Sequence, residues 1–192
     1  SLYAVHDALR FFVANKPNAL ILDFFAGSGT TLHAVNLLNA EDDGKRRCIM
    51  VTNNEVSDAE SKALSEKGFR PGDDEWEKLG VARYVTWPRT VCSIQGRDIK
   101  GQSLKGDYGV EVDDYVVDEE STVVSKTTGK PIKNKIYKKI KRQMYPKLVE
   151  MQMSDGFKAN AAFFKLGFLN PGAVALGRKF EELLPVLWMK AG

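Results

Sequence analysis

The sequence predicts an α/β fold with a mostly parallel sheet, and three neighbouring features lead to this prediction. The first is an apolar run, residues 19–23, that ends in an aspartate. It is too short for a helix and too apolar for a half-exposed strand, so we expect a strand covered on both faces. The second is a Gly-x-Gly turn followed by an amphipathic helix from Thr31 to about Asn39. The third is another strand, residues 48–52, which completes a strand–helix–strand unit with parallel strands.

The turn after the first strand has the chemistry of a ligand site. Gly27 and Gly29 let the backbone turn tightly and approach a ligand closely. The first amides of the following helix have no partner inside the helix, and with the helix dipole they favour an anionic group. No lysine follows Gly29, which excludes a P-loop, and Leu32 stands where a dinucleotide fingerprint requires a third glycine. The turn therefore predicts a nucleotide-type site of another kind; a glycine turn without a ligand is the alternative.

The stretch Asp-Phe-Phe-Ala-Gly-Ser-Gly-Thr-Thr, residues 23–31, resembles motif I of the S-adenosylmethionine-dependent DNA amino-methyltransferases. It looks most like the permuted (β-type) class, in which this motif lies late in the chain and which includes modification subunits of restriction systems. The resemblance implies a Rossmann-like, three-layer methyltransferase fold. It also implies S-adenosyl-L-methionine as cofactor and double-stranded DNA as partner. The expected reaction is methyl transfer to an amino group of a DNA base, adenine N6 ahead of cytosine N4.

The resemblance also assigns roles within the motif. Asp23 would meet the ammonium group of the cofactor, directly or through water, and Thr30 or Thr31 would meet its carboxylate. Phe25 would face the adenosine or only pack. The residues expected to bind the cofactor from this motif are Asp23, Phe25, Ala26, Gly27, Ser28, Gly29, Thr30 and Thr31.

A second group of polar residues follows the second strand. In a parallel unit the end of this strand lies beside the glycine turn, where a ribose would sit. A carboxylate there can accept hydrogen bonds from both ribose hydroxyls. Glu55 is the best candidate and corresponds to the acid of the family's motif II, with Asn53 and Asn54 as stand-ins. A loop that only ends the strand is the alternative.

The catalytic part of the family's machinery is missing from this sequence. Amino-methyltransferases use an Asp/Asn/Ser-Pro-Pro-aromatic loop, and no two prolines are adjacent here. In the permuted class this loop and the target-recognition region precede motif I. We therefore expect a fragment that pairs with a missing upstream catalytic and target-recognition region, and with a restriction subunit in some systems. We nominate no catalytic residue and no metal ligand, and we expect the fragment alone to be inactive.

The chain divides by composition into three parts. Residues 1–100 are expected to form the cofactor-binding core, residues 101–155 a charged insertion, and residues 156–192 a C-terminal strand and helix that complete the core. In the insertion an acidic run precedes a basic run, Lys126 to Lys147, across hairpin-turn residues. The two halves could pair with each other, the lysines could lie along DNA phosphates, or the whole could be a solvated charged surface.

The remaining elements follow from local signals. Helices are expected over residues 1–13, 58–67, 72–80 and 81–89, the second beginning with a Ser57–Glu60 capping box. The last of these mixes arginines with aromatics, which suits phosphate and base contacts, but a half-buried helix with surface arginines is preferred. A strand is expected at 156–168, and a final helix beginning at Asn170-Pro171 and kinked at Pro185.

Composition limits the class of protein. With 192 residues, 43% hydrophobic and 28% charged, the chain resembles one globular domain. No apolar run approaches the ~20 residues that span a bilayer, and no secretory signal is present, so we expect a cytoplasmic protein. Cys48 and Cys92 lack metal-ligand spacing, which favours buried, reduced thiols. A net charge of +3 does not by itself indicate a nucleic-acid partner, so an RNA or small-molecule methyltransferase and a non-catalytic DNA-binding or assembly module stay open.

Overall fold

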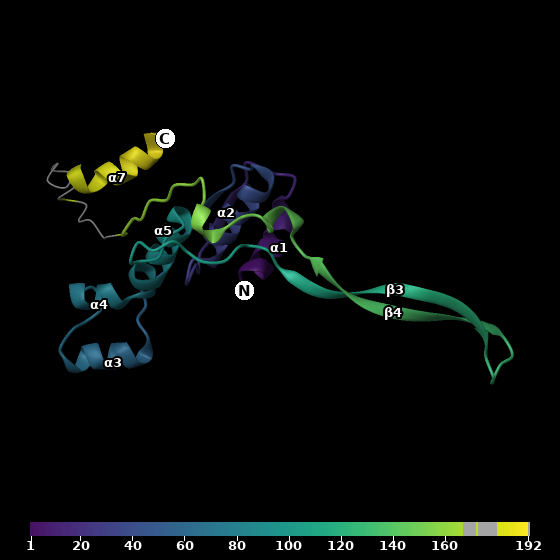
Figure 1. The fold of residues 1–192 in the computed structure, drawn as a ribbon. Helices are drawn as coiled ribbons and strands as arrows, with labels where there is room; N and C mark the ends of the chain where they lie inside the picture. Colours follow the sequence, from purple (N-terminus) through teal and green to yellow (C-terminus); the bar gives the residue numbers. More distant parts are fainter. Residues whose placement is uncertain (167–171, 173–179, 192) are drawn as a thin grey trace. The chain divides into compact units, whose positions relative to one another are not determined.

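Figure 1 shows the fold as a computed structural model, which describes residues 1–166, 172 and 180–191. The chain divides into two compact units, Ser1–Ala161 and Ala162–Gly192, which are considered separately. The first unit holds two small sheets and the helices around them, and the second holds helix α7 (Phe180–Ala191). Within the described residues, no helix is both long and apolar enough to cross a membrane.

The expected parallel unit is confirmed. Strands β1 (Leu20–Asp23) and β2 (Arg47–Met50) pair in parallel, and helix α2 (Thr30–Asp42) connects them. The helix begins one residue earlier and ends three residues later than expected. The α/β class is therefore confirmed. The described residues contain this parallel pair and one antiparallel hairpin, so the Rossmann-like three-layer arrangement remains a prediction.

The expectation that the first strand is covered on both faces is wrong for the described residues. Leu20 and Leu22 are 55% and 50% exposed, and Ile49 on β2 is 49% exposed. The alternate residues of both strands are half-buried. Successive side chains of a strand point to opposite faces, so one face of this two-stranded sheet is covered and the other, apolar face is not.

Helices α1 (Leu2–Val13) and α2 pack against each other, and a buried arginine joins them. Arg46 is 4% exposed and donates to the carbonyl of Val13 from Nε (3.1 Å) and Nη2 (2.9 Å). Nη2 also donates to the Ala14 carbonyl at 3.0 Å, and the guanidinium holds both carboxylate oxygens of Asp42 at 2.8 Å. In the sequence, residues 42–47 have only the composition of a charged turn. Arg46 instead satisfies carbonyls at the end of α1 that have no partner inside the helix.

The helices after β2 follow the sequence closely. Helix α3 (Asp58–Glu66) begins with the expected capping box, in which Ser57 and Glu60 bond each other's backbone amides. The acidic segment forms α4 (Asp74–Leu79), whose Trp76 is buried. The arginine–aromatic segment is helical, as preferred, and consists of a π-helical turn, η1 (Ala82–Thr86), that continues into α5 (Trp87–Gln95).

The charged insertion forms a long antiparallel hairpin, as its turn residues predicted. Strand β3 (Glu111–Val124) pairs along its length with β4 (Pro131–Gln143), and short 3₁₀ turns η2 (Pro146–Leu148) and η3 (Met153–Asp155) follow. The base of the hairpin enters the core of the unit. This core is a cluster of five buried side chains: Leu37, Tyr108, Tyr145, Leu148 and Phe157.

His6 is a packing residue. It is fully buried, lies edge-on to the ring of Tyr145 with centroids 5.3 Å apart, and its Nε2 lies 3.1 Å from a carboxylate oxygen of Glu41. Tyr145 in turn donates to Asp7 at 2.8 Å. These contacts hold α1, α2 and the base of the hairpin together.

The expected strand at 156–168 is wrong over its described part, residues 156–166, which have no regular structure. The amide of Phe157 donates to the Ile94 carbonyl at 3.0 Å, where Gly96 and Gly156 let two backbones meet. A Cβ at Gly156 would lie 2.2 Å from the Ile94 oxygen. The segment is thus anchored to the end of α5 through its backbone and the buried Phe157 ring, and no sheet edge receives it.

The last helix is confirmed in part. Pro185 lies inside α7, as expected for the kink position. The expected start at Asn170-Pro171 and the apolar positions Val174 and Leu176 lie outside the described residues.

Replacing Arg46 with methionine should lower the free energy of unfolding by about 2–3 kcal/mol, because the carbonyls of Val13 and Ala14 lose their side-chain donor and Asp42 loses its ion partner. Urea unfolding followed by circular dichroism at pH 7 measures this. The matched control is Arg47→Met, since the Arg47 side chain is exposed and should tolerate the change within about 0.5 kcal/mol. Equal losses in both variants would contradict the capping role.

The same variants should differ in their response to acid. The hydrogen bond from Arg46 is the main cause of the lowered pKa of Asp42. A carboxylate with a lowered pKa stabilises the folded state above its unfolded pKa, and this stabilisation is lost as the pH falls through the folded value. The wild-type chain should therefore lose more stability on acidification than Arg46→Met does.

Candidate functional site

The turn between β1 and α2 has the backbone conformation that its glycines predicted. Gly27 has φ +49° and Gly29 has φ +76°, a region that residues with a Cβ rarely adopt. Gly29 is the N-cap of α2, and its amide donates to the Ala26 carbonyl at 2.8 Å. A Cβ at Gly29 would lie 3.0 Å from Cγ2 of Thr86, so both conformation and space favour glycine here.

The first acid of the motif fixes the two ends of this turn. Asp23 accepts a hydrogen bond from the hydroxyl of Thr31 at 2.5 Å and another from the amide of Phe25 at 3.0 Å. Each carboxylate oxygen keeps a further lone pair, so Asp23 can still accept from a cationic ligand. The Thr31 hydroxyl donates to Asp23, which leaves it able only to accept from a ligand.

Arg89 stabilises the glycine turn through hydrogen bonds to Ser28 and Thr30, and the sequence did not predict this role. One guanidinium nitrogen, Nη1, lies 3.0 Å from the hydroxyl oxygens of both Ser28 and Thr30, and 3.4 Å from the Ser28 carbonyl. The preferred interpretation placed the arginines of this segment at the surface. Arg89 is half-buried, and its charge lies at the first turn of α2, close to the expected ligand. Nothing in the local pattern shows a contact that spans 61 residues.

A second support comes from the π-helical turn. The hydroxyl of Thr86 donates to the Gly27 carbonyl and lies 3.1 Å from the Val81 carbonyl. The Val81 amide donates to the Glu55 carbonyl at 2.7 Å. Because η1 contacts both the glycine turn and the segment after β2, it fixes the spacing between them. π-Helical turns are rare and occur often at functional sites.

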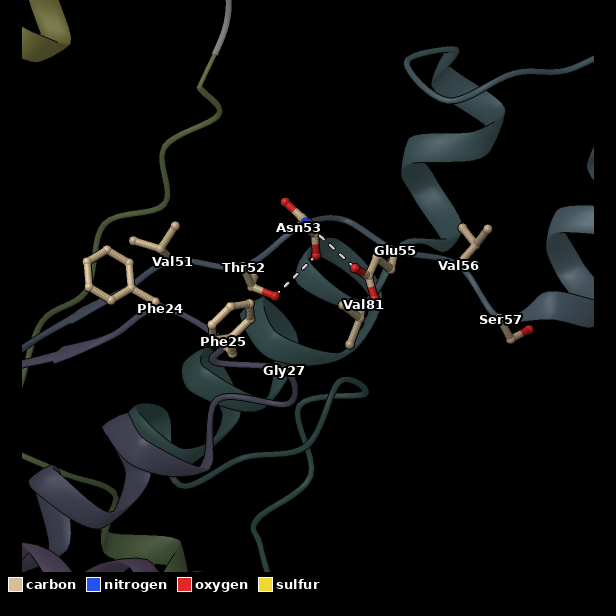
Figure 2. A pocket seen from close by; sticks show the side chains of 10 residues that line it. All are labelled: Phe24, Phe25, Gly27, Val51, Thr52, Asn53, Glu55, Val56, Ser57 and Val81. Atoms are coloured by element: carbon tan, nitrogen blue, oxygen red, sulfur yellow. Dashed lines mark hydrogen bonds between the residues drawn. The ribbon is translucent and has the colours of Figure 1, made fainter.

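Residues from both predicted groups line one pocket of about 390 Å³, shown in Figure 2, although Asp23, Ala26, Ser28, Gly29, Thr30 and Thr31 of the motif are not among its lining residues. Phe24, Phe25 and Gly27 contribute from the end of β1, and Asn53 and Glu55 from beyond β2. The volume lies in the range of about 300–1,000 Å³ that small-molecule sites occupy. Phe25 is 92% exposed, so its ring presents an aromatic face to a ligand at the pocket wall. Ala26, in contrast, is buried, and its amide bonds the Val51 carbonyl at 3.2 Å.

Of the three candidate ribose ligands in the segment after β2, two line the pocket and one has its side chain engaged elsewhere. Asn53 donates from Nδ2 to the Glu55 carboxylate at 3.4 Å, and both line the pocket (Figure 2). Asn54 points elsewhere: its Nδ2 donates to the backbone carbonyl of Glu77 at 2.7 Å, and its Oδ1 accepts from the Arg83 amide at 3.2 Å. Its amide is thus engaged in fixing the loop, which leaves Glu55 and Asn53 as candidates.

One turn beyond Gly29, helix α2 meets the base of the hairpin. His33 Nε2 lies 2.9 Å from the hydroxyl of Tyr108, and His33 Nδ1 has no partner among the described residues. Burial, aided by the Arg89 charge, lowers the pKa of His33 to about 4. Burial also raises the pKa of Tyr108 to about 12. Both groups are therefore neutral at pH 7, and Arg89 contributes a positive charge beside them.

The thiols take no part in this site. Cys48 and Cys92 are both free, as expected, although each is half-buried where full burial was expected. Burial, with Asp23 nearby, raises the pKa of Cys48 to about 11, which makes it a poor nucleophile at pH 7. Within the described ranges, no cluster of three or more His, Cys, Asp or Glu side chains is placed to hold a metal ion.

Comparison with known proteins points to the same segment. Residues 13–98 match a family model described as DNA methylase (N6_N4_Mtase), and this range contains the whole pocket and Arg89. The Type II methyltransferase M.KpnI of Klebsiella pneumoniae is 62% identical over 59 residues, 31% of this chain and 14% of that protein. The Mod subunit of the Type III restriction-modification enzyme EcoPI, from Escherichia phage P1, is 45% identical over 58 residues, 30% of this chain and 9% of that subunit.

A further relative is the Mod subunit of the Type III enzyme StyLTI from Salmonella typhimurium, 60% identical over 40 residues, 21% of this chain and 6% of that subunit. The chain thus spans only a small part of the length of the relatives it matches. These matches support a relationship to the DNA methyltransferases of restriction-modification systems. The β3–β4 hairpin lies outside the range of the family match.

Replacing Arg89 with methionine should loosen the glycine turn, because its two hydroxyls and a carbonyl lose their shared donor. Amide hydrogen exchange in residues 27–31 should become about tenfold faster, which corresponds to roughly 1.4 kcal/mol of local stability. Mass spectrometry of peptides from the exchanged protein measures this. The matched control is Arg83→Met, since the Arg83 side chain is exposed on the same helical segment. Unchanged exchange in Arg89→Met would show that the turn holds its shape without it.

Proposed function

We propose that this chain is the S-adenosylmethionine-binding segment of a DNA amino-methyltransferase of the restriction-modification kind. One observation carries the proposal: Phe25 and Gly27 of the motif after β1 line a single pocket together with Glu55 beyond β2, at the edge where parallel strands end. Ligands of open α/β sheets bind at this edge. The similarity to a DNA methylase family and to Type II and Type III modification enzymes supports the same ligand and reaction.

The residues present suit this cofactor. It carries an ammonium, a carboxylate, a ribose and an adenine. The glycine turn offers groups for the first two, and the pocket beside it offers groups for the ribose and the adenine. Asp23 keeps lone pairs for the ammonium, and the amides that open α2 suit the carboxylate, with Arg89 adding a positive charge behind them. Glu55 or Asn53 would accept from the ribose hydroxyls, and the exposed ring of Phe25 would stack on the adenine.

In this proposal the cofactor supplies the reactive methyl group, and the residues of this chain position it. When bound, the cofactor supplies a methyl group on a sulfonium, which is an electrophile. The residues of this chain bind and orient it, and Gly27 and Gly29 keep the backbone close to it without a Cβ in the way. Asp23, which bonds Thr31, and Arg89, which bonds Ser28 and Thr30, carry opposite charges and would together fix which way the amino-acid end of the cofactor points.

The acceptor side of the reaction would come from another segment. An exocyclic base amine is a poor nucleophile until acceptors draw on its protons, and the base must first be flipped out of the duplex. The Asx-Pro-Pro-aromatic loop that does this in amino-methyltransferases is not in this sequence. We propose that a catalytic and target-recognition segment packs on the uncovered apolar face of β1 and β2, where Leu20, Leu22 and Ile49 are exposed. Adenine N6 is the proposed target, cytosine N4 the alternative, and duplex DNA and a restriction subunit are the proposed partners.

Replacing Gly29 with valine should abolish S-adenosylmethionine binding, because a branched side chain at φ +76° strains the turn and its Cβ meets Thr86. Isothermal titration calorimetry with the cofactor measures the loss, and circular dichroism checks that the helices remain. The matched control is Gly101→Val, at φ +79° with nothing within 4 Å of the added Cβ. The control carries the same backbone cost far from the turn, so it should bind as the wild type does. Binding by Gly29→Val at wild-type affinity would refute the cofactor site.

The isolated chain should bind the cofactor but should not methylate DNA, because it lacks the acceptors that activate the amine. Tritiated methyl transfer to mixed-sequence duplex DNA tests this, with and without a catalytic segment carrying the proline-pair loop supplied as a second polypeptide. Activity is expected only from the combination. Methyl transfer by the isolated 192 residues would instead place an acceptor site within this chain.

A further inference from the structure

The β3–β4 hairpin has two chemically different faces. Paired residues on neighbouring strands lie on the same face, and successive pairs alternate between the faces. The pairing is continuous from Glu111–Gln143 to Val124–Pro131 apart from one irregularity, where Asp118 is the extra residue. A bulged residue shifts the alternation by one, so the faces are followed from the register rather than from residue parity. Figure 1 shows the hairpin as a two-stranded ribbon.

The first face, here called the lysine face, carries most of the basic residues of β4. Its paired rows are Glu111–Gln143, Asp113–Lys141, Tyr115–Lys139, Val117–Tyr137, Glu120–Lys135, Thr122–Lys133 and Val124–Pro131. Acids of β3 hold several of these lysines in ion pairs. Asp113 contacts Lys139 at 2.8 Å and Lys141 at 3.0 Å, and Glu120 contacts Lys133 at 3.0 Å. Of the interpretations open for the insertion, these contacts favour pairing between its two halves over a lysine arm for DNA phosphates.

The second face, here called the aliphatic face, carries a row of β-branched side chains. Its paired rows are Val112–Arg142, Asp114–Ile140, Val116–Lys138, Glu119–Ile136, Ser121–Asn134 and Val123–Ile132. Near the hairpin base Val112 and Ile140 are half-buried, but Ile132 and Ile136 farther out are each 50% exposed. A two-stranded ribbon is marginal in water by itself, and an exposed aliphatic row adds to the cost. Burial of this face against a partner surface would therefore stabilise the hairpin.

We propose that the aliphatic face packs against the same face of a second copy of this chain. Two ribbon faces of this kind stack at about 10 Å, as the sheets of a β-sandwich do. The face carries two positive and two negative side chains, so it is neutral and suits a like surface better than a polyanion. Arg142 and Asp114 already pair with each other at 3.0 Å.

The other two charges select how the copies align. Lys138 and Glu119 lie in neighbouring rows at the middle of the face, and within the described residues neither is in an ion pair. A two-fold axis through either row would place Lys138 on Lys138 or Glu119 on Glu119. An axis between the two rows, with the ribbons antiparallel, brings Lys138 of each copy beside Glu119 of the other. Such a self-complementary patch is what a two-fold interface requires.

Sedimentation equilibrium of the 192-residue chain should therefore give twice its 21.4 kDa mass. Lys138→Glu and Glu119→Lys should each weaken the dimer by at least about tenfold, because each places like charges across the interface. Mixing these two variants in equal amounts should restore the dimer, since each then meets the opposite charge on its partner. Mixing leaves the charges within each hairpin unchanged, so restoration can come only from contacts between chains.

Matched controls separate this surface from others. Ile136→Ser should yield monomers, whereas Tyr137→Ser, the same change on an exposed residue of the lysine face, should leave the dimer intact. A wild-type chain that stays monomeric overturns the proposal. So does a dimer that neither charge reversal weakens, or one that mixing does not restore. If Ile136→Ser weakens binding to a mixed-sequence duplex in fluorescence anisotropy and leaves the mass unchanged, the face binds nucleic acid and the proposal is wrong.

Discussion

The conformation of the glycine turn after β1 depends on hydrogen bonds from side chains of other elements in the first unit. Two residues at positive φ leave most of the turn outside any hydrogen-bonded ladder. Asp23 ties its start to the first turn of α2, Thr86 ties its middle to the π-helical turn, and Arg89 ties the two hydroxyls that follow. Asp23 lies next to the turn in sequence, but Thr86 and Arg89 belong to one helical segment about 60 residues further along the chain, so the turn is fully supported only when the unit is folded. A site that must meet a charged ligand without rearranging gains from such preorganisation.

The sequence predicted what local chemistry determines. Ser57 and Glu60 form their capping box because both partners lie within four residues, and the hairpin turn formed where its turn residues stood. Contacts over long distances were not predictable. Arg46 caps a helix 33 residues away and Arg89 reaches back 61 residues, and an arginine in a charged or aromatic stretch gives no sign of either. A strand was wrongly predicted after Gly156, because an apolar run has the same composition whether it pairs in a sheet or packs into the core without regular structure.

The two small sheets share one physical property. Each is two-stranded and leaves a branched aliphatic surface exposed: Leu20, Leu22 and Ile49 on one face of the parallel pair, and Ile132 and Ile136 on the hairpin, which is exposed along most of both faces. Exposed single apolar residues need no explanation, but rows of them at sheet spacing do. The parallel pair lies within the range that matches the DNA methylase family, and the hairpin lies outside it. The two surfaces are therefore expected to meet different partners, one belonging to the catalytic machinery and one to assembly.

Helix α2 connects these two parts of the molecule. Its N-cap, Gly29, ends the turn whose Phe25 and Gly27 line the pocket, and His33, four residues later, meets Tyr108 at the base of the hairpin. Four residues are about one helical turn, so both contacts lie on the same side of the helix. The His33–Tyr108 bond joins neutral groups at pH 7, because burial has lowered one pKa and raised the other. Between pH 6.5 and about 4 the unfolded chain binds a proton at His33 that the folded chain does not, so stability falls as the pH drops through this window. Acid therefore weakens the junction that joins the pocket helix to the hairpin base, and Arg89, already beside His33, makes a second positive charge there costlier still.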